Sequence, residues 1–259
     1  MRDICAPWKK REMSRFFIDK KNIISGEAII DDRDDIHHIM DVLRLKPGAA
    51  LEISDSEEWE YSAVLTSVSQ KGVRAKILDK NRFAGEPEIK VTLFQGVPKQ
   101  GKMENIVQKS VELGVHEIVP VFTARTVAAR NENFNNKIVR WQKIAGEAAK
   151  QCRRGMVPEI TEDITFSGMT DIVEDKKFSA VIFPYENEKK RSIKDAIRGI
   201  KTKPEKLAVI IGPEGGFSDE EAEALKTAGA DAVSLGRTVL RTETAGPAAI
   251  AMIMYELEL

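Results

Sequence analysis

The chain has 259 residues, 42% of them hydrophobic, which is enough for one large or two modest domains with apolar cores. Its 40 lysines and arginines nearly balance its 41 aspartates and glutamates, so the total charge gives no indication of a nucleic-acid partner. Two cysteines exclude a disulfide framework and a cysteine-based zinc site, and no apolar run approaches the roughly 20 residues that span a bilayer. We therefore expect a cytoplasmic protein that contacts no membrane.

Residues 1–12 are polar and lack a periodic pattern, and a second methionine, Met13, follows them. We interpret them as a disordered leader. From residue 13 to about 84, short apolar runs separated by turns predict strands, several of them with the alternation of a half-buried sheet. The runs are Arg15–Ile18, Ala28–Ile30, Ala50–Ile53, Tyr61–Leu65 and Val73–Leu78. Together with a helix expected over Asp34–Leu43, they indicate a small β-barrel-like domain.

Lys80–Glu88 has the composition of a linker, and after it the pattern changes to strands that alternate with helices. This alternation favours an α/β fold in which helices cover both faces of a mostly parallel sheet. The expected strands are Val91–Phe94, Glu117–Phe122, Ala180–Phe183, Ala208–Ile211 and Ala232–Leu235. The expected helices are Lys102–Leu113, Asn135–Cys152, Asp219–Ala228 and one that begins at Ala245.

Two loops near the C-terminus contain the candidate functional residues. The first, Gly212–Gly216, follows an apolar strand, and its glycines allow a tight turn with exposed backbone before a helix capped by Ser218 and Glu221. The second, Gly236–Ala245, holds Arg237, Arg241 and Glu243 before a helix that starts with small residues. In open α/β folds, small molecules bind at this edge of the sheet, although a plain turn and a solvated charged loop are the alternatives.

Other common sites are absent from the sequence. There is no GxGxxG motif after a strand, no Walker lysine and no GxSxG motif, which argues against nicotinamide binding, nucleotide hydrolysis and a serine hydrolase. The three histidines, His37, His38 and His116, are not spaced as metal ligands, so we expect no metal.

One segment is strongly basic. Residues 123–155 contain eight lysines and arginines and two glutamates, a net charge of +6. A solvated helix face is the simple explanation, but arginine also suits phosphate or an extruded base, so the segment is a candidate RNA contact.

The two loops read Gly212-Pro-Glu-Gly-Gly216 and Leu235-Gly-Arg-Thr-Val-Leu-Arg-Thr-Glu-Thr-Ala245. In this form they resemble the cofactor-binding part of the SPOUT methyltransferases, in the branch of the ribosomal RNA small subunit methyltransferase E family. The similarity extends over nearly the whole chain after residue 12. It includes Met13–Phe17, His37–Gly48, Gln95–Glu104, Gln108–Val115, Trp141–Ile144, Glu147–Ala149 and Val157–Ile160.

The resemblance implies an N-terminal PUA-like RNA-binding β-barrel at 13–84 and a SPOUT methyltransferase domain at 88–259, with a deep trefoil knot within 208–259. It also implies a homodimer that binds S-adenosyl-L-methionine. The expected reaction is methylation of N3 of one uridine, the m3U1498 position, in 16S rRNA of the small ribosomal subunit.

The resemblance also assigns candidate site residues. Arg241 is the expected cation beside the uracil oxygens, and Glu243 is either the proton acceptor or the group that orients Arg241. The expected cofactor contacts are Phe183, Pro184, Tyr185, Ile211, Gly212, Pro213, Glu214, Gly215, Gly216, Leu235, Gly236, Val239, Leu240, Arg241, Thr242 and Thr244. Candidate RNA contacts are Arg15 and Arg44 in the barrel, and Lys99, Lys102, Arg125 and Arg154 in the second domain.

Two other functions stay open on the sequence. One is a SPOUT methyltransferase that acts on transfer RNA or on a ribose oxygen. The other is a ribosome-assembly factor that binds RNA without catalysis. The barrel motifs favour the ribosomal enzyme over the first, and the intact second loop speaks against the other.

Overall fold

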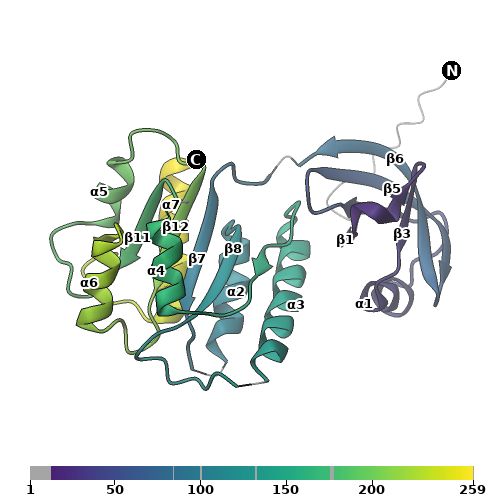
Figure 1. Cartoon of the computed structure of the whole chain (residues 1–259). Helices are drawn as coiled ribbons and strands as arrows, with labels where there is room; N and C mark the ends of the chain where they lie inside the picture. Colours follow the sequence, from purple (N-terminus) through teal and green to yellow (C-terminus); the bar gives the residue numbers. More distant parts are fainter. Residues whose placement is uncertain (1–12, 84, 100, 132, 176–177, 259) are drawn as a thin grey trace. The chain divides into compact units, whose positions relative to one another are not determined.

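The computed structural model describes residues 13–83, 85–99, 101–131, 133–175 and 178–258 (Figure 1). The expected leader, residues 1–12, lies outside the described residues. The chain divides into two compact units. One comprises the residues up to Glu86 together with Lys150–Val157, and the other comprises Pro87–Ala149 together with Pro158–Leu259.

The first unit is a curled six-stranded sheet with strand order β1-β4-β5-β6-β3-β2, a half-barrel where the sequence predicts a β-barrel. Its pairs are antiparallel except β1 with β4. The strands are β1 (Arg15–Phe17), β2 (Ile23–Ile24), β3 (Glu27–Ile30), β4 (Ala50–Ser54), β5 (Trp59–Ser69) and β6 (Gly72–Arg82). The helical turns are η2 (Lys20–Asn22), α1 (Arg33–His37) and η3 (His38–Val42), the last a π-turn that continues α1.

Strand β6 is longer than the sequence predicts. It runs to Arg82, which pairs with Trp59, so it takes in the start of the expected linker. The ammonium of Lys80 lies 3.8 Å from the centre of the Trp59 ring, and this cation–π contact stabilises charged residues at the end of an exposed strand. The polar composition of 80–82 therefore marks the solvated end of a strand.

Lys150–Val157 belongs to the first unit, which the sequence does not predict. The guanidinium of Arg15 donates to the carbonyl of Arg154 at 2.8 Å and to Glu60 at 2.8 Å. The guanidinium of Arg154 pairs with Glu86 at 2.7 Å, and its side chain is only 6% exposed. These contacts tie Lys150–Val157 to the half-barrel, and they correct the assignment of Arg154 to the second domain.

The second unit is the expected parallel α/β domain. Its strands follow the order β10-β8-β7-β12-β11-β13, with β9 also paired to β8, and every pair is parallel. The strands are β7 (Lys90–Gly96), β8 (Glu117–Phe122), β9 (Glu159–Ile160), β10 (Ile164–Thr165), β11 (Ala180–Pro184), β12 (Lys206–Ile211) and β13 (Asp231–Val233). A parallel sheet needs cover on both faces, and its inner strands here are buried apolar runs.

The helices of this unit are α2 (Lys102–Glu112), α3 (Phe134–Cys152, up to Ala149), α4 (Phe166–Glu174), α5 (Ile193–Arg198), α6 (Asp219–Thr227) and α7 (Thr242–Leu257). Helix α7 packs against α2, α5, β7 and β12, whereas α4 and α6 pack on a core formed by residues such as Phe94, Phe183 and Ile210 (Figure 1). Among the described residues, no helix is long and apolar enough to cross a bilayer.

The strand order brings three loops together. Strands β12, β11 and β13 are neighbours, and they are parallel, so the loops that follow them emerge at the same edge of the sheet. Strand β7 lies between β12 and β8. The chain continues from β7 to β8, on the side of β7 away from β12, whereas the strands that follow β12 and β11 lie on the opposite side of β7. Such a switch in direction is where open α/β sheets hold their ligands.

Candidate active site

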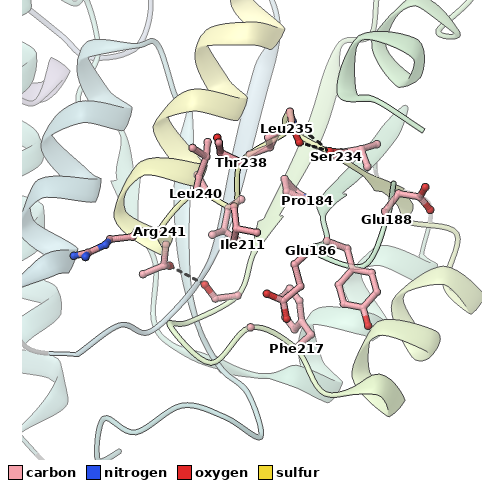
Figure 2. Close-up of a pocket in the computed structure, with 18 of the residues that line it drawn as sticks. Pro184, Glu186, Glu188, Ile211, Phe217, Ser234, Leu235, Thr238, Leu240 and Arg241 are labelled. Carbon is pink, nitrogen blue, oxygen red and sulfur yellow. Dashed lines mark hydrogen bonds between the residues drawn. The ribbon is translucent and has the colours of Figure 1, made fainter. Parts of the chain in front are cut away.

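A cavity of about 930 Å³ opens where the loops after β11, β12 and β13 meet (Figure 2). Its volume is in the range of pockets that hold cofactor-sized molecules. Side chains of Pro184, Ile211, Phe217, Leu235 and Leu240 give it apolar walls. Charged side chains also line it, so it offers an apolar surface and a few polar groups to a ligand.

The first glycine-rich loop takes the conformation that its sequence requires. Gly216 has φ +65°, a left-handed conformation that favours glycine, and its N–H donates to the carbonyl of Pro213 at 2.9 Å. At the end of β7, a Cβ on Gly96 would lie 2.5 Å from the backbone nitrogen of Pro213, so only glycine lets β7 approach this loop. The predicted capping box of Ser218 and Glu221 then begins α6.

A buried threonine joins the two loops. The hydroxyl of Thr242 donates to the carbonyl of Gly212 at 2.7 Å, and the side-chain amide of Gln95 donates to the Thr242 oxygen at 2.9 Å. Helix α7 begins at Thr242, earlier than the expected Ala245, because the N–H groups of Thr244 and Ala245 both reach the Arg241 carbonyl. The second loop is thus fixed to the first at the base of the cavity.

A lysine at the start of α2 pairs with both loops. The ammonium of Lys102 lies 3.0 Å from Oε1 of Glu214 and 3.3 Å from Oε2 of Glu243. Its hydrogen bond with Glu214, assisted by Glu243, raises the pKa of Lys102 above its ordinary value. Lys102 is therefore charged, and it bridges one carboxylate from each loop.

Both carboxylates stay ionised at neutral pH. Burial opposes the charge of Glu214, but hydrogen bonds from its own N–H, from Lys102 and from the Lys99 N–H outweigh it and lower its pKa. The pKa of Glu243 is lowered first by its own N–H, in the first turn of α7, and then by Lys102 and Arg241. Among the described residues, Oε2 of Glu243 is buried with no hydrogen-bond partner, so Lys102 stabilises it by charge.

The structure places most predicted cofactor contacts at the cavity. Of the predicted set, those on its wall are Pro184, Tyr185, Ile211, Gly212, Pro213, Glu214, Gly216, Leu235, Gly236, Val239, Leu240, Arg241 and Thr242. Gly215 and Thr244 lie beside this wall in the chain without lining it, and Phe183 is buried against Phe217 in the core. Arg241 is exposed, and Figure 2 shows its guanidinium on the side of the cavity away from Glu188.

The candidate RNA contacts fall into two groups. Lys102 lines the cavity, the Lys99 N–H donates to Glu214, and Arg125 donates to the carbonyl of Gly215 at 2.8 Å, so these three residues surround the first loop. Arg15, Arg44 and Arg154 belong to the other unit. Arg44 is exposed, whereas the guanidinium groups of Arg15 and Arg154 have internal partners that RNA would have to replace.

The sequence does not predict some of the residues that line the cavity. They come from the loop after β11 and from the ends of β13 and the first loop, and they are Glu186, Glu188, Lys189, Lys190, Ser192, Phe217, Val233 and Ser234. In the sequence, the feature that could have indicated these residues is the polar run Tyr185–Arg191, which directly follows an apolar strand. In the part of the chain that is described, no cluster of three or more histidine, cysteine or acidic side chains could hold a metal ion.

Comparison with known proteins gives a consistent result. Residues 85–254 match the model of the RNA methyltransferase domain, and residues 30–78 match that of the RNA methyltransferase PUA domain. The chain is 32% identical over 253 residues to ribosomal RNA small subunit methyltransferase E of Bacillus subtilis, an alignment that covers 95% of this chain and 98% of the relative.

Two solved structures are similar over nearly their full length. One is ribosomal RNA small subunit methyltransferase E from Neisseria gonorrhoeae bound to S-adenosyl methionine, with TM-score 0.81, 28% identity, and coverage of 94% of this chain and 98% of that one. The other is the putative methyltransferase Lpg2936 from Legionella pneumophila in complex with the cofactor SAM, with TM-score 0.83, 28% identity and the same coverage. With these two domains and this likeness over its length, the chain belongs to the ribosomal RNA small subunit methyltransferase E family.

Proposed function

We propose that this chain transfers a methyl group from S-adenosyl-L-methionine to N3 of a uridine, the m3U1498 position, in 16S rRNA of the small ribosomal subunit. The observation that carries the proposal is the cavity at the joined loops, which lies within the RNA methyltransferase domain. Two structural relatives are described as bound to this cofactor, and the named relatives act on small-subunit ribosomal RNA.

The cavity suits the cofactor. Its volume of about 930 Å³ accommodates an adenosine with an amino-acid arm, and Ile211, Leu235 and Leu240 offer apolar surface to a purine. The backbone of Gly212–Gly216 and of Leu235–Thr242 would hold its polar edges. When bound, the cofactor supplies an electrophilic methyl group on a sulfonium.

The chain's own residues would then prepare the nucleophile. Uracil N3 must lose a proton, and Arg241 at the cavity wall would stabilise the anion that develops on the ring oxygens. Glu243 has a lowered pKa and is therefore a weak base. We assign it the role of orienting Arg241 by charge, and assign the proton to solvent. Holding the base in line with the methyl carbon supplies most of the rate.

The RNA would reach this site as an extruded base, because N3 of a paired or stacked uridine is inaccessible. Lys99 and Arg125 are exposed beside the first loop, and we propose that they contact phosphate there. We retain Arg44 as a contact in the PUA unit, where it is exposed. Arg15, Lys102 and Arg154 would contact RNA only after exchanging their ion-pair partners.

Two further features of the family are part of the proposal. Helix α7 exposes an apolar side with Met252 at 37% and Tyr255 at 72% exposure, which suits a homodimer interface. The segment that connects β13 to α7 starts beside β11, on the side away from β12, and returns to β7 and β12, against which α7 packs. This path suits a trefoil knot within 208–259.

The test is methyl transfer to small ribosomal subunits that lack the modification, with the product nucleoside identified by mass spectrometry. The wild-type chain should form 3-methyluridine, and Arg241→Ala should reduce the rate by at least about 100-fold, as for loss of one transition-state partner. Methylation of transfer RNA or of a ribose oxygen would replace the proposed substrate. RNA binding without any methyl transfer would indicate an assembly factor.

A further inference from the structure

One cavity residue has no assigned role. Glu186 follows the end of β11 and lines the cavity. Figure 2 shows its carboxylate directed into the space between Phe217 and Ile211. Across that space, a Cβ added to Gly216 would lie 3.9 Å from Oε1 of Glu186, so the carboxylate lies near the first glycine-rich loop.

The other acidic side chains of the cavity wall already have partners. Glu188 accepts from the N–H groups of Lys190 and Arg191, at 2.6 Å and 3.0 Å, and so holds its own loop. Glu214 accepts from the Lys99 N–H and pairs with Lys102. Within the described residues, Glu186 has no hydrogen-bond or ion-pair partner, so its carboxylate is available to a ligand.

An ionised carboxylate is only an acceptor, and it prefers charged or hydroxyl donors. Figure 2 shows Glu186 across the cavity from Arg241, the residue proposed to act at the reacting end. The part of an adenosyl donor that lies away from the reacting methyl includes the ribose, whose two adjacent hydroxyls can both donate to one carboxylate. An acidic side chain just after a strand plays this part toward ribose in other α/β folds.

We propose that Glu186 is a cofactor-binding residue that accepts hydrogen bonds from the 2′- and 3′-hydroxyls of the adenosine ribose. The inference rests on the proposed function, because it names a contact within the same cavity. It adds a specificity determinant on the β11 loop to the backbone contacts of the other two loops. It also predicts discrimination against deoxyribose.

The test measures binding and needs no turnover. Calorimetric titrations would use 5′-methylthioadenosine, which keeps the ribose but has no amino-acid arm, and its 2′-deoxy and 3′-deoxy analogues. Each ligand would be titrated into the wild-type chain and into Glu186→Ala. S-adenosylhomocysteine, which carries the arm and its ammonium, would be titrated in parallel.

Glu186→Ala should weaken 5′-methylthioadenosine and S-adenosylhomocysteine equally, by about tenfold, as expected for charge-assisted hydrogen bonds. The deoxy analogues should bind the wild-type chain about tenfold more weakly than the parent ligand and should lose little more in Glu186→Ala. A loss confined to S-adenosylhomocysteine would assign Glu186 to the ammonium and overturn the proposal. An unchanged affinity for all ligands would also overturn it.

Controls separate this inference from the proposed function. Glu205→Gln removes one exposed carboxylate outside the cavity and should leave all affinities unchanged. Because Glu186 is exposed, both variants should unfold at the wild-type temperature. If the wild-type chain binds none of these ligands, the proposed function fails. If it binds them and Glu186→Ala binds them equally well, only the role of Glu186 fails.

Discussion

The hydroxyl of Thr242 donates a hydrogen bond of 2.7 Å to the carbonyl of Gly212, and this bond joins the two loops that build the cavity. The two residues are 30 positions apart in the sequence, and Thr242 is only 6% exposed. A buried hydroxyl that both donates and accepts fixes the position of both neighbours. The shape of the cavity therefore depends on this contact.

Thr242→Val keeps the shape of the side chain but leaves the Gly212 carbonyl and the Gln95 amide each without one partner. We expect a loss of about 1–3 kcal/mol in the free energy of unfolding, measured by urea denaturation. The affinity for S-adenosylmethionine should fall as well. Thr202→Val, at an exposed threonine outside the cavity, is the matched control and should change neither quantity. Wild-type stability and affinity in Thr242→Val would contradict the role of this bond.

Lys102→Met removes the cation between Glu214 and Glu243. Because the pKa of each carboxylate is lowered by folding, each contributes stability to the folded chain. This stability is present above pH 4.5, the ordinary pKa of the group, and is lost as the pH falls through the lower pKa of the folded state. The raised pKa of Lys102 contributes stability that is present below 10.5 and is lost as the pH rises through the higher folded value.

The wild-type chain should therefore be more stable than Lys102→Met by a constant amount between about pH 5 and 10, and this difference should shrink on either side. Denaturation at pH values within this range, below it and above it would measure the difference. Lys109→Met removes a lysine of the same helix that pairs with Glu112 on the surface, and it should have a much smaller effect. A difference independent of pH throughout would show that Lys102 acts by packing alone.

Arg154→Ala and Arg44→Ala separate structure from RNA binding. Arg154 is buried with Glu86, so its loss leaves a largely buried carboxylate without its cation and should cost about 3–5 kcal/mol of stability. Arg44 is exposed, so Arg44→Ala should unfold like the wild type. If Arg44 contacts phosphate, its loss should reduce the salt dependence of RNA binding by about one unit of slope. If Arg44→Ala lowered the stability and Arg154→Ala changed only the salt dependence of RNA binding, this separation of roles would be wrong.

Tyr255→Glu tests the proposed dimer. Tyr255 is 72% exposed on α7, so a charge there should not unfold the chain but should separate a dimer that buries it. Sedimentation velocity should show dimers for the wild type and monomers for the variant. Val127→Glu changes an apolar residue of similar exposure, 73%, outside this helix and should stay dimeric. If the wild-type chain is monomeric at micromolar concentration, the proposed homodimer is wrong.

The sequence predicts the regular parts of the fold because their patterns are local. Apolar runs identify β7, β8, β11 and β12, and glycine with small residues identifies the two loops. Helix α5 has only six residues, too few to show a repeated helical pattern, and the sequence predicts neither it nor α4. The end of β6 has the composition of a linker because its residues are polar on both sides of the strand.

The features of the site that the sequence does not predict depend on contacts between distant segments. Lys102 is 112 residues before Glu214, and only the fold brings its ammonium beside that carboxylate. Glu186 belongs to a polar run that is typical of any surface turn, and only the neighbouring loops make it part of a cavity. Lys150–Val157 joins the half-barrel through ion pairs such as Lys150 with Asp35, which no periodicity encodes.

The most direct test of the account is calorimetric titration of S-adenosylmethionine into the wild-type chain and into Leu240→Trp, which places a bulky ring in the cavity wall. One cofactor should bind per wild-type chain, and binding should be lost in the variant, with both proteins folded by circular dichroism. No binding by the wild-type chain, or equal binding by both, would contradict the claim that the joined loops form the cofactor site.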